Sequence, residues 1–150
     1  MKRFASTVAV VGMFFIFMVS ADSFARKESE GWRSVNNEVF LNTKSIARLS
    51  DETVSLWMKI VPEKGGAVFS ETEQQLKEKG KDPRTYGYTG VLCEIDCVNH
   101  QYREVSKIFY KKDTNIIHSL NDSAASWQRI SPWSVFHDVH VDVCDHAALW

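Results

Sequence analysis

Cysteine, glycine and proline are scarce in this chain, which has 3, 7 and 3 of them among 150 residues. None of the glycines forms a phosphate-cradling loop of the Walker or dinucleotide-binding type. The nucleophile elbow G-x-S-x-G and the zinc-protease motif H-E-x-x-H are also missing. The sequence therefore lacks the signatures of nucleotide binding and of two large hydrolase classes.

An excess of charge of one sign is missing as well, since the formal net charge is only -1. Phosphate contacts need clustered Lys and Arg, so nucleic acid is disfavoured as a partner. Hydrophobic and charged contents of 44% and 25% argue against a largely disordered chain or a polytopic membrane protein. A chain of this length fits one domain with its own core.

The longest apolar stretch, from Val8 to Val19, is too short to cross the roughly 30 Å of bilayer hydrocarbon as a stable helix. Lys2 and Arg3 precede it and small residues follow it, a pattern typical of a secretory signal peptide. We predict that residues 1–25 are removed, with cleavage after Ala21 as the alternative, and that residues 26–150 are exported to the periplasm, the cell surface or the medium, without stable membrane insertion. No cysteine follows the cleavage site to accept a lipid.

Export favours disulfide formation by the cysteines. Cys93 and Cys97 lie four positions apart in an expected strand, roughly 13 Å from each other, so they cannot pair there. Any internal bridge must therefore use Cys144. We interpret Cys93 as a small buried hydrophobe rather than a reactive thiol, and its spacing from Cys97 differs from the C-x-x-C redox motif.

Strict alternation of apolar and other residues predicts strands, most clearly over residues 53–61 and 86–98. Further strands are expected at 38–41, 101–110 and 115–120, and Asn99-His100 is a candidate two-residue turn. Neighbouring strands joined by short turns form an antiparallel meander.

Two helices are expected. Ser70 and Glu73 fit a capping box that opens a helix ending near Lys79, with Gly80 as its stop, and Leu76 is its one strongly apolar residue. A helix so polar is expected to be an exposed excursion between strands.

Ser131-Pro132 resembles the start of the second helix, which would place five residues on one face: Trp133, Phe136, Val139, His140 and Val143. A strand is the competing interpretation, because four valines in this segment share one parity. We prefer the helix. The sequence thus predicts a single α+β domain, in which one antiparallel sheet carries a C-terminal helix packed on it and a polar helical excursion between strands.

The densest polar cluster comprises His137, Asp138, His140, Asp142, Cys144, Asp145 and His146. On a helix, His137, His140 and Cys144 share one face and offer zinc two imidazoles and a thiolate. The favoured interpretation is instead that the histidines lie at the edge of an amphipathic helix. We expect no metal, cofactor or catalytic residue.

Two other groups of residues are candidates for catalysis or binding. Glu94 and Asp96 are expected about 7 Å apart on one strand face, a spacing that glycosidase carboxylates adopt, although neighbouring acids on a strand are usually only solvated. Several aromatic residues can line a sugar-binding or protein-binding surface or simply stabilise the sheet, which is the favoured use: Trp57, Tyr86, Tyr88, Tyr102 and Tyr110.

Several short motifs follow one another along the chain: Trp32-Arg33-Ser34-Val35, Val39 to Ile46, Val54 to Ile60 with Trp57, Glu94-Ile95-Asp96-Cys97 with Tyr102-Arg103, Trp127 to Ser134, and Cys144. This order resembles the bacterial surface-adhesin protein E family. The resemblance implies a small antiparallel sheet whose C-terminal helix is tied by a Cys97 to Cys144 disulfide.

The resemblance also implies binding of host extracellular proteins such as vitronectin and laminin. The family's binding segment is basic, whereas the nearest basic residues here, Lys77, Lys79 and Lys81, are separated by Glu78 and Gly80. The leading hypothesis is an exported, non-enzymatic binding or structural module that contacts a protein or another envelope or extracellular macromolecule. The alternative is a small periplasmic enzyme or metal-binding protein that uses His137 and His140.

Overall fold

A computed structural model describes residues 31–145 of the chain. The expected signal peptide at 1–25 and His146 of the polar cluster lie outside the described residues. All strands and helices below belong to the described part.

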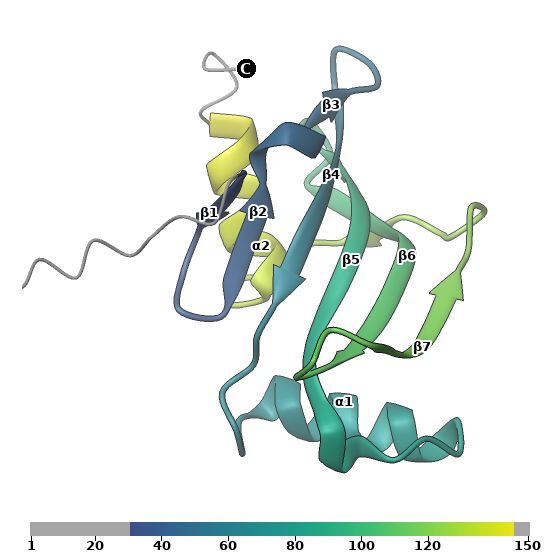
Figure 1. The fold of residues 1–150 in the computed structure, drawn as a ribbon. Coiled ribbons are helices and arrows are strands. Elements are labelled where there is room, and N and C mark those ends of the chain that lie inside the picture. Colours follow the sequence, from purple (N-terminus) through teal and green to yellow (C-terminus); the bar gives the residue numbers. More distant parts are fainter. Residues whose placement is uncertain (1–30, 146–150) are drawn as a thin grey trace, which may run out of the picture.

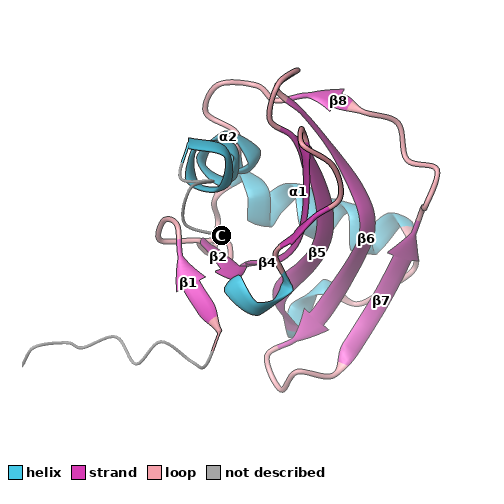
Figure 2. Ribbon diagram, turned by 90° about the horizontal axis from the view of Figure 1, so that it is seen from above, coloured by secondary structure: helices cyan, strands magenta, loops and turns pink. Residues whose placement is uncertain are grey.

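The strands form one antiparallel sheet (Figure 1), as predicted. Along its path the order is β1, β2, β4, β5, β6, β7, so β1 and β7 are its edges, and the sheet between them is curved (Figure 2). The elements are β1 (Trp32–Ser34), β2 (Val39–Asn42), β3 (Ala47–Arg48), β4 (Thr53–Ile60), β5 (Tyr86–Asp96), β6 (Gln101–Lys111), β7 (Ile116–Asn121) and β8 (Gln128–Arg129).

Three short strands, β1, β3 and β8, were not predicted from the sequence. β2 pairs with the last residues of β4, while β3 pairs with Val54 and Ser55 near its start. β8 likewise pairs with the first residues of β6, beside the region paired with β7. β4 and β6 thus each share one edge between two partners. A 3₁₀ turn, η1 (Thr43–Ser45), links β2 to β3.

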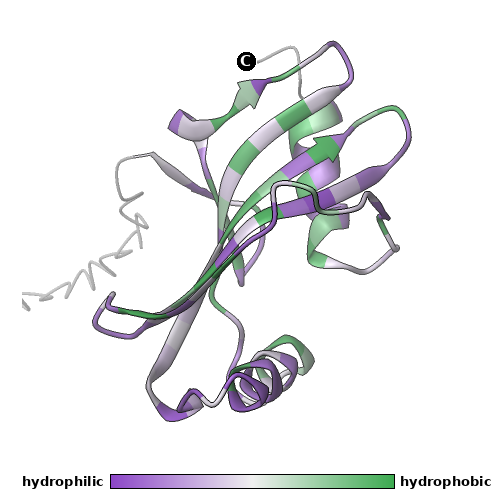
Figure 3. Cartoon of the chain, turned by 90° about the vertical axis from the view of Figure 1, so that its right-hand side faces the viewer, coloured by the Kyte–Doolittle hydropathy of each residue, from purple (hydrophilic) through white to green (hydrophobic). Residues whose placement is uncertain are grey.

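Alternation along the strands separates two faces (Figure 3). The buried residues of β4 are every second one, from Val54 to Ile60, and they pair across strands with Val91, Cys93 and Ile95 of β5. We call this side the helix-covered face, because Phe136, Val139 and Val143 from the C-terminal helix pack into the same cluster. Burial of these side chains supplies the main hydrophobic stabilisation of the domain.

The C-terminal helix α2 (Val135–His140) continues as a π-helical turn, η3 (Val141–Asp145), which excludes the strand interpretation. Its N-cap is Ser134, whose side chain accepts from the backbone N–H of His137, and not Ser131 as expected. Phe136, Val139, His140 and Val143 are buried as predicted. Trp133 was wrongly placed with them, because it precedes the helix and is 99% exposed.

The polar helix α1 (Ala67–Glu78) begins earlier than predicted, with Gly66 as N-cap. Ser70 is already inside the helix, where its hydroxyl donates to the carbonyl of Gly66. The predicted stop is confirmed: Gly80 has a φ of 67°, and Gly80 N–H and Lys81 N–H donate to the carbonyls of Lys77 and Leu76. This pattern is a Schellman motif, which needs a left-handed residue after the helix.

Helix α1 is more than the exposed excursion that its composition predicts. Leu76 is fully buried against Tyr86 and Phe109 in a second, smaller apolar cluster. Phe109 pairs with Thr89 of β5, two residues before Val91, so α1 packs on the same face as α2 but toward the other end of the sheet (Figure 1). Among residues 31–145, neither helix is long and apolar enough to cross a membrane.

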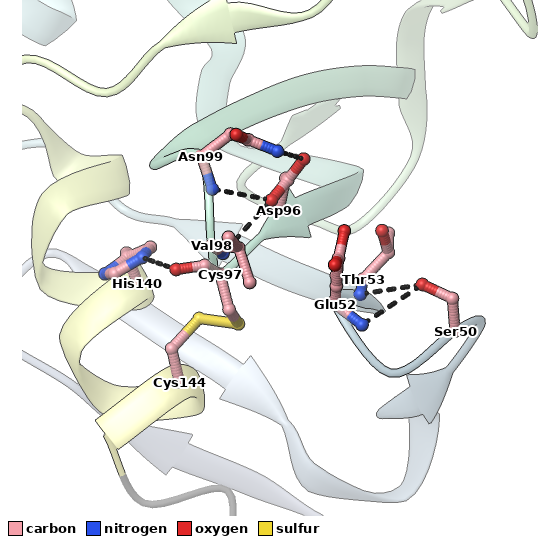
Figure 4. The surroundings of a disulfide bond; sticks show 9 residues. All are labelled: Ser50, Glu52, Thr53, Asp96, Cys97, Val98, Asn99, His140 and Cys144. Carbon is pink, nitrogen blue, oxygen red and sulfur yellow. Dashed lines mark hydrogen bonds between the residues drawn. A yellow bond between two sulfur atoms is a disulfide. The ribbon is translucent and has the colours of Figure 1, made fainter.

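A disulfide joins Cys97 to Cys144, with Cα atoms 5.5 Å apart (Figure 4). Strand β5 ends at Asp96, so Cys97 lies in the turn after the strand, which spans 97–100 and is longer than the expected two residues. Cys93 is free and fully buried. Burial raises the pKa of its thiol, which keeps it protonated and unreactive.

Replacing both bridge cysteines should destabilise the fold strongly. The bond closes a loop of 47 positions, and the chain-entropy model gives about 4 kcal/mol for such a closure. We expect the Cys97→Ser/Cys144→Ser variant to lose about this much free energy of unfolding, measured by urea denaturation, and to match the reduced wild-type protein. Equal urea midpoints of unfolding for the variant and the oxidised wild type would contradict a stabilising role of the disulfide.

Candidate binding site

The face opposite the helices carries an aromatic pocket of about 340 Å³. Its lining residues all lie on strands: Trp32, Asn42, Trp57, Lys59, Tyr88, Gly90, Ile108 and Tyr110. They share a side because cross-strand partners point the same way, and Lys59 pairs with Gly90, which pairs with Ile108. We call this side the aromatic face.

Stacked rings form one wall of the pocket. The rings of Tyr88 and Tyr110, which pair across β5 and β6, lie 4.6 Å apart and 14° from parallel. Lys59 Nζ lies 4.2 Å from the centre of the Tyr88 ring, within reach of a cation–π interaction. Burial, together with the nearby Tyr110, raises the pKa of Tyr88, so its phenol stays neutral and can donate a hydrogen bond.

Gly90 forms the floor of the pocket. A Cβ atom at this position would lie 3.2 Å from the Tyr110 ring and 3.9 Å from the Trp57 ring. Any side chain here would therefore crowd Tyr110 and occupy space between the aromatic walls. Glycine within a strand often marks a place where another group approaches the backbone closely.

The 3₁₀ turn η1 positions Trp57. The Trp57 backbone N–H donates to the Ser45 hydroxyl at 2.9 Å, and this hydroxyl donates to the Asn42 carbonyl at 2.8 Å. The contact falls between the part of β4 paired with β2 and the part paired with β3. Trp57 and Asn42, two lining residues from different strands, are thus held to the same hydroxyl.

The composition of the pocket suits an apolar or aromatic group with a polar neighbour. Its walls are mainly aromatic, while Lys59 and Asn42 supply an ammonium and an amide at the rim. Ligand pockets commonly combine such apolar walls with a few polar groups that fix orientation. The arrangement can bind a side chain or ring, and its polar groups can select the orientation.

The structure brings together only part of the aromatic set proposed from the sequence. Trp57, Tyr88 and Tyr110 line the pocket. Tyr86 is instead buried, with its hydroxyl 2.8 Å from that of Thr89, and Tyr102 stacks on Phe136 on the helix-covered face. For Tyr86 and Tyr102, these contacts fit the interpretation that the aromatic residues stabilise the fold.

Sequence reasoning missed Trp32, Lys59 and Gly90 as pocket residues. Lys59 and Gly90 carry a usable signal, because each lies two positions from an aromatic residue on its own strand and so shares its face. Trp32 carries none, since its place depends on the pairing of a three-residue strand with β2.

The histidine cluster does not assemble as the metal hypothesis requires. Cys144 is engaged in the disulfide, which removes the thiolate from the set (Figure 4). His140 is buried with Nε2 3.4 Å from the Cys97 carbonyl, while the side chain of His137 is half exposed beside Asp138. Within residues 31–145, the structure holds no group of three or more His, Cys, Asp or Glu side chains placed to bind a metal.

The two carboxylates considered for glycoside cleavage have structural partners. Glu94 accepts from Arg103, with Oε2 2.6 Å from Nη2. Asp96 accepts from the backbone N–H groups of Val98 and Asn99 and so shapes the turn that contains Cys97 (Figure 4). Burial alone would raise the pKa of Asp96, but hydrogen bonds from Asn99 and Val98 lower it, which favours a carboxylate acceptor over a general acid.

Residues 30–145 match the family model of surface-adhesin protein E. The chain belongs to the surface-adhesin protein E family. The resemblance noted in the sequence is thus confirmed. No curated relative matched the chain.

Solved structures of protein E share the fold of this family member. Crystal form II of Haemophilus influenzae protein E superposes with a TM-score of 0.55 at 13% identity, over 79% of this chain and 91% of that one. Protein E from non-typeable Haemophilus influenzae superposes with a TM-score of 0.51 at 15% identity, over 80% of this chain and 79% of that one. Identities this low show the shared fold alone.

His140 should make stability sensitive to acid. Burial lowers the pKa of His140 below its ordinary 6.5, against the opposing effect of the Cys97 carbonyl, with His100, Asp145 and His137 as the nearby titratable groups. The unfolded chain therefore takes up this proton at higher pH than the folded one. The stabilisation is complete above pH 6.5 and is lost as pH falls below that value.

Thermal unfolding followed between about pH 5 and 8 tests this assignment. We expect the melting temperature of the wild-type protein to fall below pH 6.5 and His140→Gln to make this fall less steep. His137→Gln changes a half-exposed ring on the same helix and should keep the wild-type fall. If the melting temperatures of wild type and His140→Gln fell in parallel with pH, another group would be responsible for the sensitivity to acid.

Proposed function

We propose that residues 1–25 direct export and that the mature chain is a non-enzymatic binding module at the cell envelope or outside it. Its aromatic pocket receives an apolar or aromatic side chain from an exposed segment of a protein partner. The observation that carries this proposal is the gathering of Trp32, Trp57, Tyr88 and Tyr110 around a glycine floor on the face opposite both helices.

Such a pocket has the features of an interface hot spot. Tyr and Trp dominate hot spots because they bury large areas at low cost in conformational entropy. Burying one aromatic side chain of a partner contributes roughly 1.5–3 kcal/mol. The pocket alone would support weak binding, and the surrounding sheet face would add contact area.

A binding role accounts for the polar groups better than catalysis does. Glu94 pairs with Arg103, Asp96 shapes a turn, and Cys144 is bonded to Cys97. These three groups, which the sequence offered for hydrolysis or metal binding, thus already have structural partners. Membership in an adhesin family also favours binding.

The basic residues near the end of α1 give weaker support for a binding segment. Lys77 lies 4.0 Å from Glu73 on the same helix, and the helix ends before Gly80. The three lysines therefore form no continuous basic strip of helix. We place partner binding at the aromatic pocket instead.

Binding of residues 26–150 to immobilised vitronectin and laminin, the host proteins that the family resemblance implies, tests the proposal by surface plasmon resonance. We expect measurable binding that Tyr88→Ser weakens about tenfold, the effect of losing one hot-spot contact of about 1.4 kcal/mol. Gly90→Val should act similarly by filling the pocket.

Trp127→Ser is the matched control, because Trp127 is a partly exposed aromatic residue that does not line the pocket. Circular dichroism should show that all variants keep the fold. Binding that is equal for wild type, Tyr88→Ser and Gly90→Val would refute the pocket as the site, and no binding to either protein would refute them as ligands.

A further inference from the structure

A second cavity, of about 600 Å³, lies on the helix-covered face between α1 and α2. We call it the acidic groove. Its lining comes from the sheet, from both helices and from the loops before β2 and α2.

Negative charge predominates in the acidic groove. Four segments far apart in the sequence each supply one carboxylate to the lining: Glu38, Glu71, Glu104 and Asp138. The single Lys or Arg of the lining, Lys107, has its Nζ 2.8 Å from Glu104. The groove therefore keeps a surplus of carboxylates over cations, although the whole chain is nearly neutral.

The other carboxylates contact mainly neutral donors. Glu71 accepts from the side-chain amide of Gln75, and Asp138 accepts from that of Asn36 at 2.7 Å. Asp138 also lies 3.7 Å from a ring nitrogen of His137, which is a cation only when protonated. Hydrogen bonds of this kind orient the carboxylates but do not cancel their charge.

Trp133 stands at the rim of this groove. Its side chain is 99% exposed, the largest exposed fraction among the big apolar residues of the described chain. Its backbone has a φ of 72°, a left-handed conformation that is uncommon for bulky residues. The next residue, Ser134, is the N-cap of α2, so the Trp133 ring projects from the turn immediately before this helix.

We propose that the acidic groove binds an extended, lysine-rich or arginine-rich segment of a partner protein. Charge complementarity selects this occupant: long cationic side chains would place their ends near Glu71 and Asp138 and their apolar stems against Phe136 and Val68. Trp133 would cover a cation from outside, since indole is the best side chain for cation–π contacts. This surface is separate from the aromatic pocket on the opposite face.

A synthetic peptide of alternating lysine and glycine is the probe, titrated calorimetrically into residues 26–150 with the disulfide intact. We expect binding that weakens as salt is added, whereas a peptide of alternating glutamate and glycine should not bind. Glu71→Gln combined with Asp138→Asn should weaken binding roughly tenfold, because two attractive charges are removed while the side-chain shapes are kept.

The chain offers close controls. Glu78 lies on the same helix as Glu71 and likewise accepts from a glutamine four residues away, but it does not line the groove. Glu78→Gln should therefore leave binding unchanged. Trp133→Ala should weaken binding and Trp127→Ala should not, and both change exposed or partly exposed side chains, so the fold is expected to survive.

Several outcomes would overturn the proposal. The lysine peptide fails to bind, or the glutamate peptide binds as tightly as the lysine peptide. A further such outcome is that Glu78→Gln weakens binding of the lysine peptide as much as Glu71→Gln combined with Asp138→Asn does. Tyr88→Ser serves to separate the two sites, because it alters the aromatic pocket and should leave peptide binding unchanged. Peptide binding that falls with Tyr88→Ser but not with Trp133→Ala would assign the peptide to the aromatic pocket instead.

Discussion

The disulfide between Cys97 and Cys144 is the constraint on which the rest of the structure depends. Helix α2 has only six residues, and a helix this short is marginal by itself in water. The bond attaches the π-helical turn after α2 to the turn after β5, while Phe136, Val139 and Val143 bury their side chains against the sheet. The covalent link and the apolar contacts together hold α2 on the helix-covered face of the sheet.

Because α2 is held on one side of the sheet, the two faces of the sheet differ in what they expose. On the helix-covered face, the separation between α1 and α2 leaves the acidic groove, with carboxylates from both helices. On the other face, the alternate residues of β4, β5 and β6 form the aromatic pocket. This member of the surface-adhesin protein E family thus carries two candidate contact surfaces that suit different partner chemistries.

The long elements were predictable from the sequence because their patterns are local. Alternation over β4 and β5 and the Schellman glycine after α1 depend on residues close in the chain. The strands β1, β3 and β8 have two or three residues each, too few for a period, and exist because β2, β4 and β6 offer them partners. The candidate site depends on the same long-range pairings, so its aromatic residues were recognised only in part. Trp133 fits the helical period and is nevertheless exposed, because the helix begins after it.

Peptide mapping of the non-reduced protein by mass spectrometry tests the central claim most directly. Proteolysis should release one linked pair of peptides that contains Cys97 and Cys144, and a separate peptide with Cys93 as a free thiol that is alkylated only after denaturation. A link from Cys93 to Cys144, or three free thiols, would contradict the account, because α2 would then lack the bond that holds it to the turn after β5.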